Sequence, residues 1–302
     1  MMSSYRASLM TGVFTFLVLI SVAYATPVLK SVDNLEKLHH LTDGCRSRDD
    51  SLVGQNPKCF SEQCMRIVMD NEIDSEKVSK LLQITKKGMN SRSKDGIGGP
   101  TIMDINTGYI RDTNGLDNLF ALENKIITED DFQTYSEVIH RLKSLIETNF
   151  DIDNVYFTAP TFITRLDGRA DWQPSEIHDE YWHVHTDMNN TDHYQYSGLM
   201  YLSTYEEDFT GGRLVFVDAD DEMTATHIVE PRAGRIALFS SGQENPHYVE
   251  RLTGGQRFVL AFWFTCVPNK QFEIFLDGKS HLTFSEKVGR QFNAHMKRAS
   301  EL

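Results

Sequence analysis

The spacing of hydrophobic residues predicts two helices in the first half of the chain. The first is expected to begin at the polar segment 74–76, and its apolar positions share one helical face: Val78, Leu81, Leu82 and Met89. The second follows a capping box made by Thr128 and Asp131 and continues to about residue 149. Residues 90–117, between the two, are rich in Gly, Asn, Asp and Ser, so we expect a loop there.

After residue 150 the pattern changes to short runs of strand-forming residues. Turn signals rich in glycine, proline or aspartate separate these runs, which cover residues 155–164, 198–204, 213–219, 235–241 and 257–265. Many short strands at such spacing are typical of an antiparallel sandwich or barrel. Because the helices come first and the strands afterwards, we expect an α+β fold in which the helices back one sheet. The domain is expected to cover residues 66–270, with a charged tail at 271–302.

A hydrophobic run near the N-terminus predicts a targeting segment. Arg6 precedes the run, which ends in small residues at Ala23 and Ala25, the pattern of a secretory signal peptide. An uncleaved signal anchor is the alternative, because the run is only slightly shorter than a membrane span. Residues 1–25 are therefore interpreted as a signal peptide or signal anchor. Both place the rest of the chain in the endoplasmic reticulum lumen or outside the cell, with a membrane contact only through the anchor.

The four cysteines agree with an oxidising compartment. Cys45, Cys59 and Cys64 lie in the polar stretch 26–65, which we interpret as a cysteine-containing stalk, and Cys266 lies far from them. We expect one or two disulfides among the four. A zinc site at the first cluster is the alternative, but it lacks a matching second pair of ligands.

Composition and charge exclude several classes of function. The chain is 40% hydrophobic and 24% charged, which is ordinary for one large globular domain or two small ones. Its formal net charge of −13 repels phosphate backbones, so nucleic-acid binding is not expected. No second hydrophobic run is long enough to cross a bilayer, which excludes a multi-span membrane protein.

Four residues of the strand-rich half form a candidate metal and co-substrate site. His185 and Asp187 are two positions apart, so a strand would present both on one face. His247, on a neighbouring strand, would complete two histidines and one carboxylate, the facial triad that binds non-haem iron(II) and leaves positions open. Arg257 begins the last apolar strand, and its guanidinium would suit the distal carboxylate of a bound 2-oxoglutarate.

Four residues near this constellation have weaker interpretations. His183 shares strand parity with His185, so we expect it to support the site or contact substrate rather than bind metal. Trp182 points the other way by parity and is expected in the core. Tyr201 is either a donor to 2-oxoglutarate or a core aromatic residue. Asn189 begins a glycosylation sequon close to the site, for which we expect low occupancy.

Between Cys59 and Cys266 the chain resembles the iron(II)- and 2-oxoglutarate-dependent dioxygenases with a prolyl 4-hydroxylase-type catalytic domain. The resemblance lies in the segments PTFITRLDG, HDEYWHVHTD, YLSTYEEDFTGGRLVFVD, VEPRAGRIALFSSGQENPHYVE and GGQRFVLAFWFTC, in this order. It implies a double-stranded β-helix, or jelly roll, with supporting N-terminal helices. Collagen-type prolyl 4-hydroxylases favour lysine at the position of Arg257, which resembles instead the arginine of prolyl 3-hydroxylase-like relatives.

The resemblance also implies an enzyme with Fe2+, 2-oxoglutarate and ascorbate as cofactors. Its iron ligands would be His185, Asp187 and His247, its 2-oxoglutarate anchor Arg257, and its substrates O2 and a protein or peptide side chain. A catalytically inactive jelly-roll binding module is the first alternative, and the complete triad with its arginine argues against it. A cupin that uses neighbouring histidines is the second, but Asn189 stands where a cupin usually has glutamate.

Overall fold

The structure is a computed structural model of the chain. It describes residues 28–29, 38–41, 56–61, 64–90, 99–112, 115–119, 126–158, 161–169, 171–174 and 180–272. The predicted signal segment, Cys45 and nearly all of the predicted charged tail lie outside these ranges. Within them, no helix combines the length and the apolar character that a membrane span needs.

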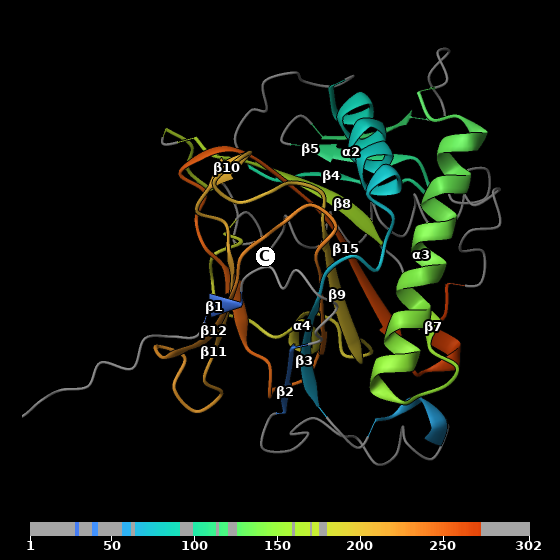
Figure 1. Ribbon diagram of the computed structural model, residues 1–302, viewed down its shortest axis with the longest axis vertical. Helices are drawn as coiled ribbons and strands as arrows, with labels where there is room; N and C mark the ends of the chain where they lie inside the picture. The colour runs from blue at the N-terminus through green and yellow to red at the C-terminus, as the bar shows by residue number, and fades with distance from the viewer. Residues whose placement is uncertain are drawn as a thin grey trace, which may run out of the picture.

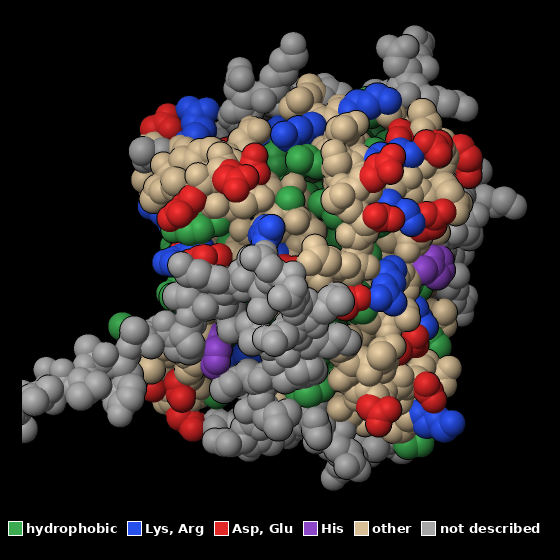
Figure 2. Space-filling model, viewed as in Figure 1, with side chains coloured by type: hydrophobic (Ala, Val, Ile, Leu, Met, Phe, Trp, Pro, Cys, Tyr) green, Lys and Arg blue, Asp and Glu red, His purple; other side chains and the backbone are tan. Residues whose placement is uncertain are grey.

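The two predicted helices are α2 (Ser75–Asn90) and α3 (Glu129–Phe150). The capping box at the start of α3 is confirmed. The side chain of Thr128 accepts a hydrogen bond from the Asp131 amide at 3.2 Å, and Asp131 Oδ2 accepts one from the Thr128 amide at 2.9 Å. Both helices bury one apolar face against the larger sheet and leave the other to solvent (Figure 1). Acidic and basic side chains are interspersed on the solvent face (Figure 2).

The larger sheet holds the central strands of the fold. Its strands, in spatial order, are β2 (Leu38–Leu41), β3 (Met65–Met69), β13 (Ile236–Ser240), β9 (Tyr196–Tyr201), β15 (Gly254–Thr265), β8 (Phe162–Asp167), β4 (Thr101–Met103), β5 (Tyr109–Asp112) and β6 (Gly115–Asn118). Two short strands, β7 (Tyr156–Phe157) and β10 (Phe209–Thr210), also pair with β15.

The prediction of a loop over residues 90–117 is wrong in its second half. Residues 101–103, 109–112 and 115–118 form the antiparallel strands β4, β5 and β6, which extend the larger sheet beyond β8. These strands have three or four residues each, and their polar, turn-rich sequence shows no clear alternation of hydrophobic and polar residues. Pairing with the edge of β8 decides their conformation, because β propensity depends strongly on context.

The smaller sheet lies across the fold from the helices (Figure 1). Its strands, in spatial order, are β1 (Val28–Leu29), β12 (Ala225–Val229), β11 (Leu214–Val217) and β14 (His247–Val249). A bridge between His185 and His247 adds one more segment beyond β14. The short strands β1 and β2, which come from the stretch predicted as a stalk, therefore pair with the two sheets.

The order in which the chain visits the two sheets is that of a jelly roll. It passes from β8 in the larger sheet to the His185 segment in the smaller one, and returns to β9. It continues through β11 and β12, back to β13, across to β14 and finally to β15. The two sheets are thus wound together, as in a double-sheet jelly roll. The predicted jelly-roll core is confirmed.

The alternation of β15 separates the two hydrophobic cores. Phe258, Leu260, Phe262 and Phe264 face the helices and join the larger core. Val259, on the opposite face, joins a second core between the two sheets, which consists of Val68, Tyr201, Leu214, Phe216, Val229, Ala237, Phe239 and Val259. The predicted inward face of this strand therefore borders the space between the sheets.

Two disulfides involve the described cysteines, as the sequence predicted. Cys59, at the end of the short helix η1 (Pro57–Cys59), is bonded to Cys266 just after β15. The chain then continues into η4 (Pro268–Lys270). Cys64 is also disulfide-bonded. Because these sulfurs are oxidised, the zinc alternative at Cys59 and Cys64 is wrong.

Candidate metal centre

The structure brings the three predicted ligand residues together. One ligand atom from each of His185, Asp187 and His247 lies within 4.8 Å of the other two. The His185 Nε2 atom is 3.8 Å from Asp187 Oδ1, and the His247 Nε2 atom is 4.0 Å from Asp187 Oδ2. These separations leave room for one ion that contacts all three atoms, because metal–ligand distances near 2 Å place ligands about 3–4 Å apart.

The expected strand geometry of this segment is only half correct. His185 lies in the bridge with His247, as a strand residue would. Asp187 instead begins the short helix α4 (Asp187–Asn190), whose first residues turn the chain away from the sheet. The carboxylate meets the imidazoles because a helical turn, rather than strand alternation, directs it. Pairing of two distant segments sets this turn, so local spacing does not reveal it.

Backbone carbonyls orient both imidazole rings. The Nδ1 atom of His185 donates to the carbonyl oxygen of His183 at 3.0 Å, and that of His247 donates to the carbonyl oxygen of Asn245 at 2.9 Å. With Nδ1 protonated in this way, each Nε2 atom keeps its lone pair and points toward Asp187. Such carbonyl partners commonly fix the tautomer and direction of metal-binding histidines.

The burial of His247 favours its neutral form. Only 5% of this residue is exposed, and its ring packs against Phe239 and Phe216 at centroid distances of 4.9 and 5.7 Å. Burial lowers the pKa of His247 from 6.5 to about 4, although the nearby Asp187 carboxylate opposes this effect. A neutral imidazole is the form that binds a metal.

The donor set fits non-haem iron(II). Two imidazole nitrogens and one carboxylate oxygen, gathered on one side of a shared point, are the arrangement that leaves further coordination positions free for small ligands. Of the residues that would hold such an ion, His185 and His247 are the two partners of one β-bridge, and Asp187 is the first residue of α4. The jelly roll itself therefore fixes their relative positions.

Arg257 is buried in the same interior and lacks a partner for much of its guanidinium. It is 2% exposed, and its Nε and Nη2 atoms have no hydrogen-bond partner among the described residues. Burial lowers its pKa. Leaving a buried guanidinium uncompensated costs several kcal/mol, so this position calls for an anion. A carboxylate is the anion that matches the fork of an arginine best.

Tyr201 lies next to that guanidinium. Its ring centroid is 5.4 Å from the Cζ atom of Arg257, and its buried hydroxyl has no hydrogen-bond partner in the described part of the chain. Burial raises the pKa of Tyr201, so the hydroxyl remains a donor. Its ring belongs to the core between the sheets, as one of the two sequence interpretations expected, and its role as a donor to 2-oxoglutarate stays a prediction.

The prediction for His183 agrees with the structure, whereas the prediction for Trp182 does not. His183 is outside the group of three, and its Nδ1 atom contacts the carbonyl oxygen of Glu180. Trp182 is only partly buried, so the prediction that it belongs to the core is wrong. Its ring contacts Tyr181 at 5.0 Å and lies under the guanidinium of Arg251 at 4.8 Å. Strand parity failed here because residues 180–186 do not form a continuous strand.

An aromatic wall on the inner face of the larger sheet was not singled out from the sequence. It consists of Trp263, Phe162 and Tyr194: the Trp263 ring stacks on Tyr194 at 5.3 Å and meets Phe162 at 5.3 Å. Trp263 follows Arg257 and Val259 on the inward face of β15, and Phe162 pairs opposite Ala261. The rings of Trp263 and Phe162 are partly exposed although their strands are paired on two sides, so this face of the sheet keeps two aromatic rings accessible.

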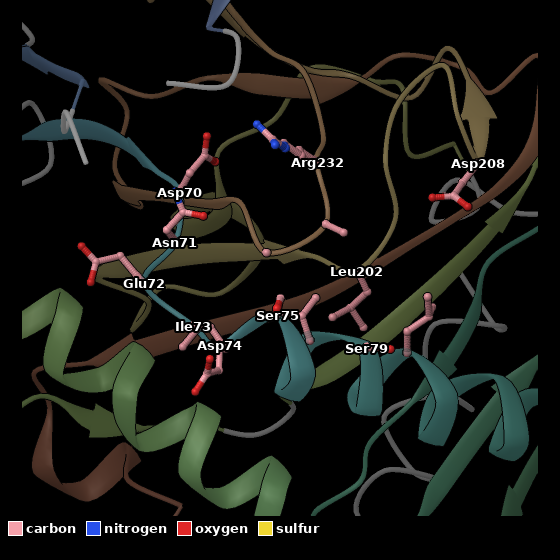
Figure 3. Close-up of a pocket in the computed structure, with 14 residues that line it drawn as sticks. Asp70, Asn71, Glu72, Ile73, Asp74, Ser75, Ser79, Leu202, Asp208 and Arg232 are labelled. Atoms are coloured by element: carbon pink, nitrogen blue, oxygen red, sulfur yellow. The ribbon is translucent and has the colours of Figure 1, made fainter. Parts of the chain in front are cut away.

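A separate pocket lies between the start of α2 and the loops that flank β9 and β13. It measures about 670 Å³, and acidic side chains surround it, among them Glu72, Asp74 and Asp208 (Figure 3). None of the predicted site residues lines it. Two of its carboxylates are paired with arginine: Asp70 with Arg235, and Glu72 with Arg141.

The Asn189 side chain is exposed near the triad. Its Oδ1 atom accepts a hydrogen bond from Gln243, in the loop before His247. The expected low occupancy of the sequon stays a prediction.

Comparisons with known proteins agree with this geometry. Residues 172–265 match the family model of the 2OG-Fe(II) oxygenase superfamily. The chain is 36% identical over 222 residues to 2-oxoglutarate and iron-dependent oxygenase domain-containing protein 3 of Mus musculus, a match that covers 71% of this chain and 67% of the relative. It is 42% identical over 92 residues to prolyl 3-hydroxylase 3 of Homo sapiens, covering 30% of this chain and 12% of that protein.

Among solved structures, the chain is similar to a prolyl hydroxylase from Trichoplax adhaerens in complex with a peptide of a hypoxia inducible factor. It covers 66% of this chain and 83% of its own, at 17% identity and a TM-score of 0.46. The family assignment follows from the relative in Mus musculus, which exceeds 30% identity over two thirds of its length. The chain therefore belongs to the 2OG-Fe(II) oxygenase superfamily and is an oxidoreductase of that family.

Proposed function

We propose that this oxygenase hydroxylates a protein or peptide side chain, in the manner of a prolyl hydroxylase, within the secretory pathway. The single observation that carries the proposal is that one protein interior contains both the His185, Asp187 and His247 triad and a buried arginine, Arg257, with unsatisfied hydrogen-bond donors. A binding module without chemistry would have no need for both. The prolyl 3-hydroxylases among the relatives support a protein substrate.

Each residue of the site has a role that follows from its geometry. His185, Asp187 and His247 would hold the iron through two nitrogens and one oxygen, and Arg257 would pair with the distal carboxylate of 2-oxoglutarate. When bound, iron and 2-oxoglutarate supply a coupled oxidation, in which O2 converts the co-substrate to succinate and CO2 while a substrate C–H bond is hydroxylated.

The chain around these groups excludes water and orients the co-substrate. Phe216 and Phe239 cover the His247 ring, and Val259 separates Arg257 from the aromatic wall. A dry interior strengthens the pairing between the guanidinium and a carboxylate, because charges attract more strongly where the effective dielectric constant is low. The hydroxyl of Tyr201 would add one more hydrogen bond to the same carboxylate.

The aromatic wall supports an apolar target on the substrate. Trp263, Phe162 and Tyr194 present ring faces and edges that suit an aliphatic side chain or a pyrrolidine ring. The wall carries no charge that would hold an acidic or basic group. A proline-containing or aliphatic stretch of a peptide is therefore the substrate chemistry that we favour.

Localisation and the accessory reductant are further parts of the proposal. The disulfide between Cys59 and Cys266 supports an oxidising compartment such as the endoplasmic reticulum lumen or the cell exterior. Ascorbate, which the family resemblance implies, would keep the iron in the ferrous state.

Succinate release and iron content, measured across four variants, test the proposal. His185→Ala, Asp187→Ala and His247→Ala should each abolish 2-oxoglutarate turnover, with Asp187→Ala weakening iron most because it removes the only anionic ligand. His183→Ala is the matched control from the same segment, and it should keep its iron with at most a partial loss of rate. Circular dichroism checks the fold of each variant. Incubation with peptides of secreted proteins, followed by mass spectrometry for added oxygen, identifies the target residue.

Two outcomes would contradict the proposal. If all four variants bind as much iron as the wild type, the metal site lies elsewhere and the inactive binding module replaces the enzyme. If His183→Ala loses iron while His185→Ala keeps it, the ligand set is shifted by two residues, as in the cupin-like alternative.

A further inference from the structure

A buried arginine from β3 reaches the loop that presents His247. Arg66 is 4% exposed and lies opposite Phe239 in the pairing of β3 with β13. Its guanidinium donates from Nε to Asn245 Oδ1 at 2.7 Å, from Nη2 to the Glu244 carbonyl oxygen at 3.2 Å, and from Nη1 to Thr226 Oγ1 at 2.8 Å. One side chain thereby ties three separate segments: β3, β12 and the loop between β13 and β14.

The contacts continue from this arginine to the metal-facing histidine. The side-chain amide of Asn245 is held on both sides, since its Oδ1 accepts from Arg66 and its Nδ2 donates to the carbonyl and hydroxyl oxygens of Ser240, both at 2.8 Å. The backbone carbonyl of the same asparagine accepts the Nδ1–H of His247 at 2.9 Å. Fixing this amide therefore fixes the carbonyl that directs the imidazole.

A second set of contacts connects Arg66 to His247 through the ring of Phe216. The Arg66 guanidinium lies over the Phe216 ring, 4.5 Å from its centroid, and that ring packs against His247 at 5.7 Å. Phe239, which pairs with Arg66 across the sheet, contacts His247 from another side at 4.9 Å. Two of the rings that pack against the imidazole are therefore a ring under the Arg66 guanidinium and the residue opposite Arg66 in the neighbouring strand.

Burial of this charge needs a reason beyond packing. A buried guanidinium costs several kcal/mol unless its hydrogen bonds are satisfied, and an apolar side chain of similar size is often as stable. The partners that Arg66 finds are an amide, a hydroxyl, a backbone carbonyl and the Nδ1 atom of His227, in addition to the nearby Glu244 side chain. Three directional donors from one rigid plane hold a loop in one position better than apolar contacts do.

We infer that Arg66 is a positioning residue for the metal centre, which holds the His247 imidazole through Asn245 and Phe216 so that its Nε2 atom faces Asp187. The inference rests on the proposed metal site and adds to it a residue of β3, a strand at the side of β13. A loosened Asn245 carbonyl would let the imidazole rotate, and the iron affinity would fall while the ligand residues themselves remained intact.

The test compares two buried arginines of the same strand pair. Arg66→Met removes the guanidinium that reaches Asn245. Arg235→Met, the matched control, removes a guanidinium that is 1% exposed and forms a bidentate pair with Asp70 at 2.9 and 3.0 Å. Fe(II) affinity is measured by anaerobic equilibrium dialysis, and melting temperature by circular dichroism.

Both variants should melt at a lower temperature, but only Arg66→Met should bind Fe(II) more weakly, by about 10–100-fold, the usual effect of removing a group that orients a ligand. Arg66→Lys keeps the charge but cannot fork, so it should recover stability more than iron affinity. In an Asn245→Ala background, the further change Arg66→Met should lower the Fe(II) affinity only slightly, because both substitutions remove the same hydrogen bond between Arg66 and Asn245. These variants keep the test available if Arg66→Met does not fold.

Equal iron affinity in Arg66→Met and the wild type would overturn the inference while leaving the proposed function in place. Equal weakening in Arg66→Met and Arg235→Met would also overturn it, because the effect would then be one of general stability. If the wild type binds no Fe(II), the proposed metal site and this inference both fail.

Discussion

At Arg257 the protein buries a charge whose Nε and Nη2 atoms find no partner within the described residues. The nearest aromatic group, Tyr201, leaves its hydroxyl equally unsatisfied. Buried polar atoms are normally hydrogen-bonded, so several unsatisfied ones at a single point indicate a ligand that completes them. We propose that the carboxylate of 2-oxoglutarate is that ligand, and the energy of this pairing can be measured by substitution.

Arg257→Ala should weaken 2-oxoglutarate binding and leave Fe(II) binding nearly unchanged. Loss of a buried, charge-assisted contact costs on the order of 2–5 kcal/mol. Arg257→Lys should recover only part of this affinity, because an ammonium group cannot form two parallel hydrogen bonds. Titration of 2-oxoglutarate into the iron-loaded protein measures both variants. Normal binding by Arg257→Ala would show that the co-substrate carboxylate is held elsewhere.

A second residue-scale prediction concerns pH. Asp104 is buried, and burial raises its pKa from 3.8 to about 6, although hydrogen bonds from Thr107 and Asn106 oppose the shift. Because the folded-state pKa is raised, this group contributes stability that is present below about pH 4 and is lost as the pH rises through about 6. A shift of about two units corresponds to about 3 kcal/mol.

Asp104→Asn should therefore remove this pH dependence. The difference in unfolding free energy between wild type and variant, measured by urea denaturation, should change in favour of the variant from about pH 4 to about pH 7. If the two curves run parallel over this range, the buried carboxyl does not titrate as its environment predicts.

At the scale of elements, the packing of the Phe262 side chain of β15 over β9 depends on Gly198. This residue pairs with Phe262 in β15 and Leu238 in β13. A Cβ atom placed on it would lie 2.1 Å from the Phe262 ring and 3.0 Å from the Leu238 side chain. Phe262 is buried against the helices and cannot move without disturbing that core. The glycine thus lets an aromatic ring cover the strand next to it.

Gly198→Ala should destabilise the fold by about 1–3 kcal/mol, because overpacking forces the Phe262 ring from its position. Urea denaturation measures the free energy of unfolding. Adding Phe262→Leu to Gly198→Ala should restore part of the loss, since the smaller side chain makes room for the new methyl group. Additive losses in the double variant would mean that the ring is not the obstacle.

At the scale of the whole molecule, one disulfide joins the segment before β3 to the segment after β15. Cys59 precedes β3 and Cys266 follows β15, and 207 residues separate them. Both cysteines are almost completely buried. A crosslink over so long a loop restricts the unfolded chain strongly, which in the chain-entropy model corresponds to about 5 kcal/mol, with about 2–4 kcal/mol more typical of measured disulfides.

Replacing both cysteines, as Cys59→Ser with Cys266→Ser, should lower the melting temperature while the jelly roll still forms. Calorimetry of the double variant and of the wild type measures the effect, and thiol titration confirms that the bond is intact in the wild type. An unchanged melting temperature would show that packing of η1 against the end of β15 already closes the domain.

The sequence by itself determined the features that depend on neighbouring residues or on side-chain chemistry. The α3 capping box, the two faces of β15 and the grouping of His185, Asp187 and His247 could all be predicted, because periodicity, spacing and ligand type are local properties. The spacing of the short strands predicted an antiparallel sandwich or barrel, since such strands need two facing sheets to bury their apolar sides, and the family resemblance implied that it is a jelly roll.

Only the tertiary structure decided which distant groups meet. The pairing of Cys59 with Cys266, the strands β4 to β6 and the helical turn at Asp187 each depend on a partner far along the chain. The contact of Arg66 with Asn245 spans 179 residues, and nothing in either local sequence marks it. Burial gives such contacts their energetic weight, because a polar group removed from water must find its partner wherever the fold places one.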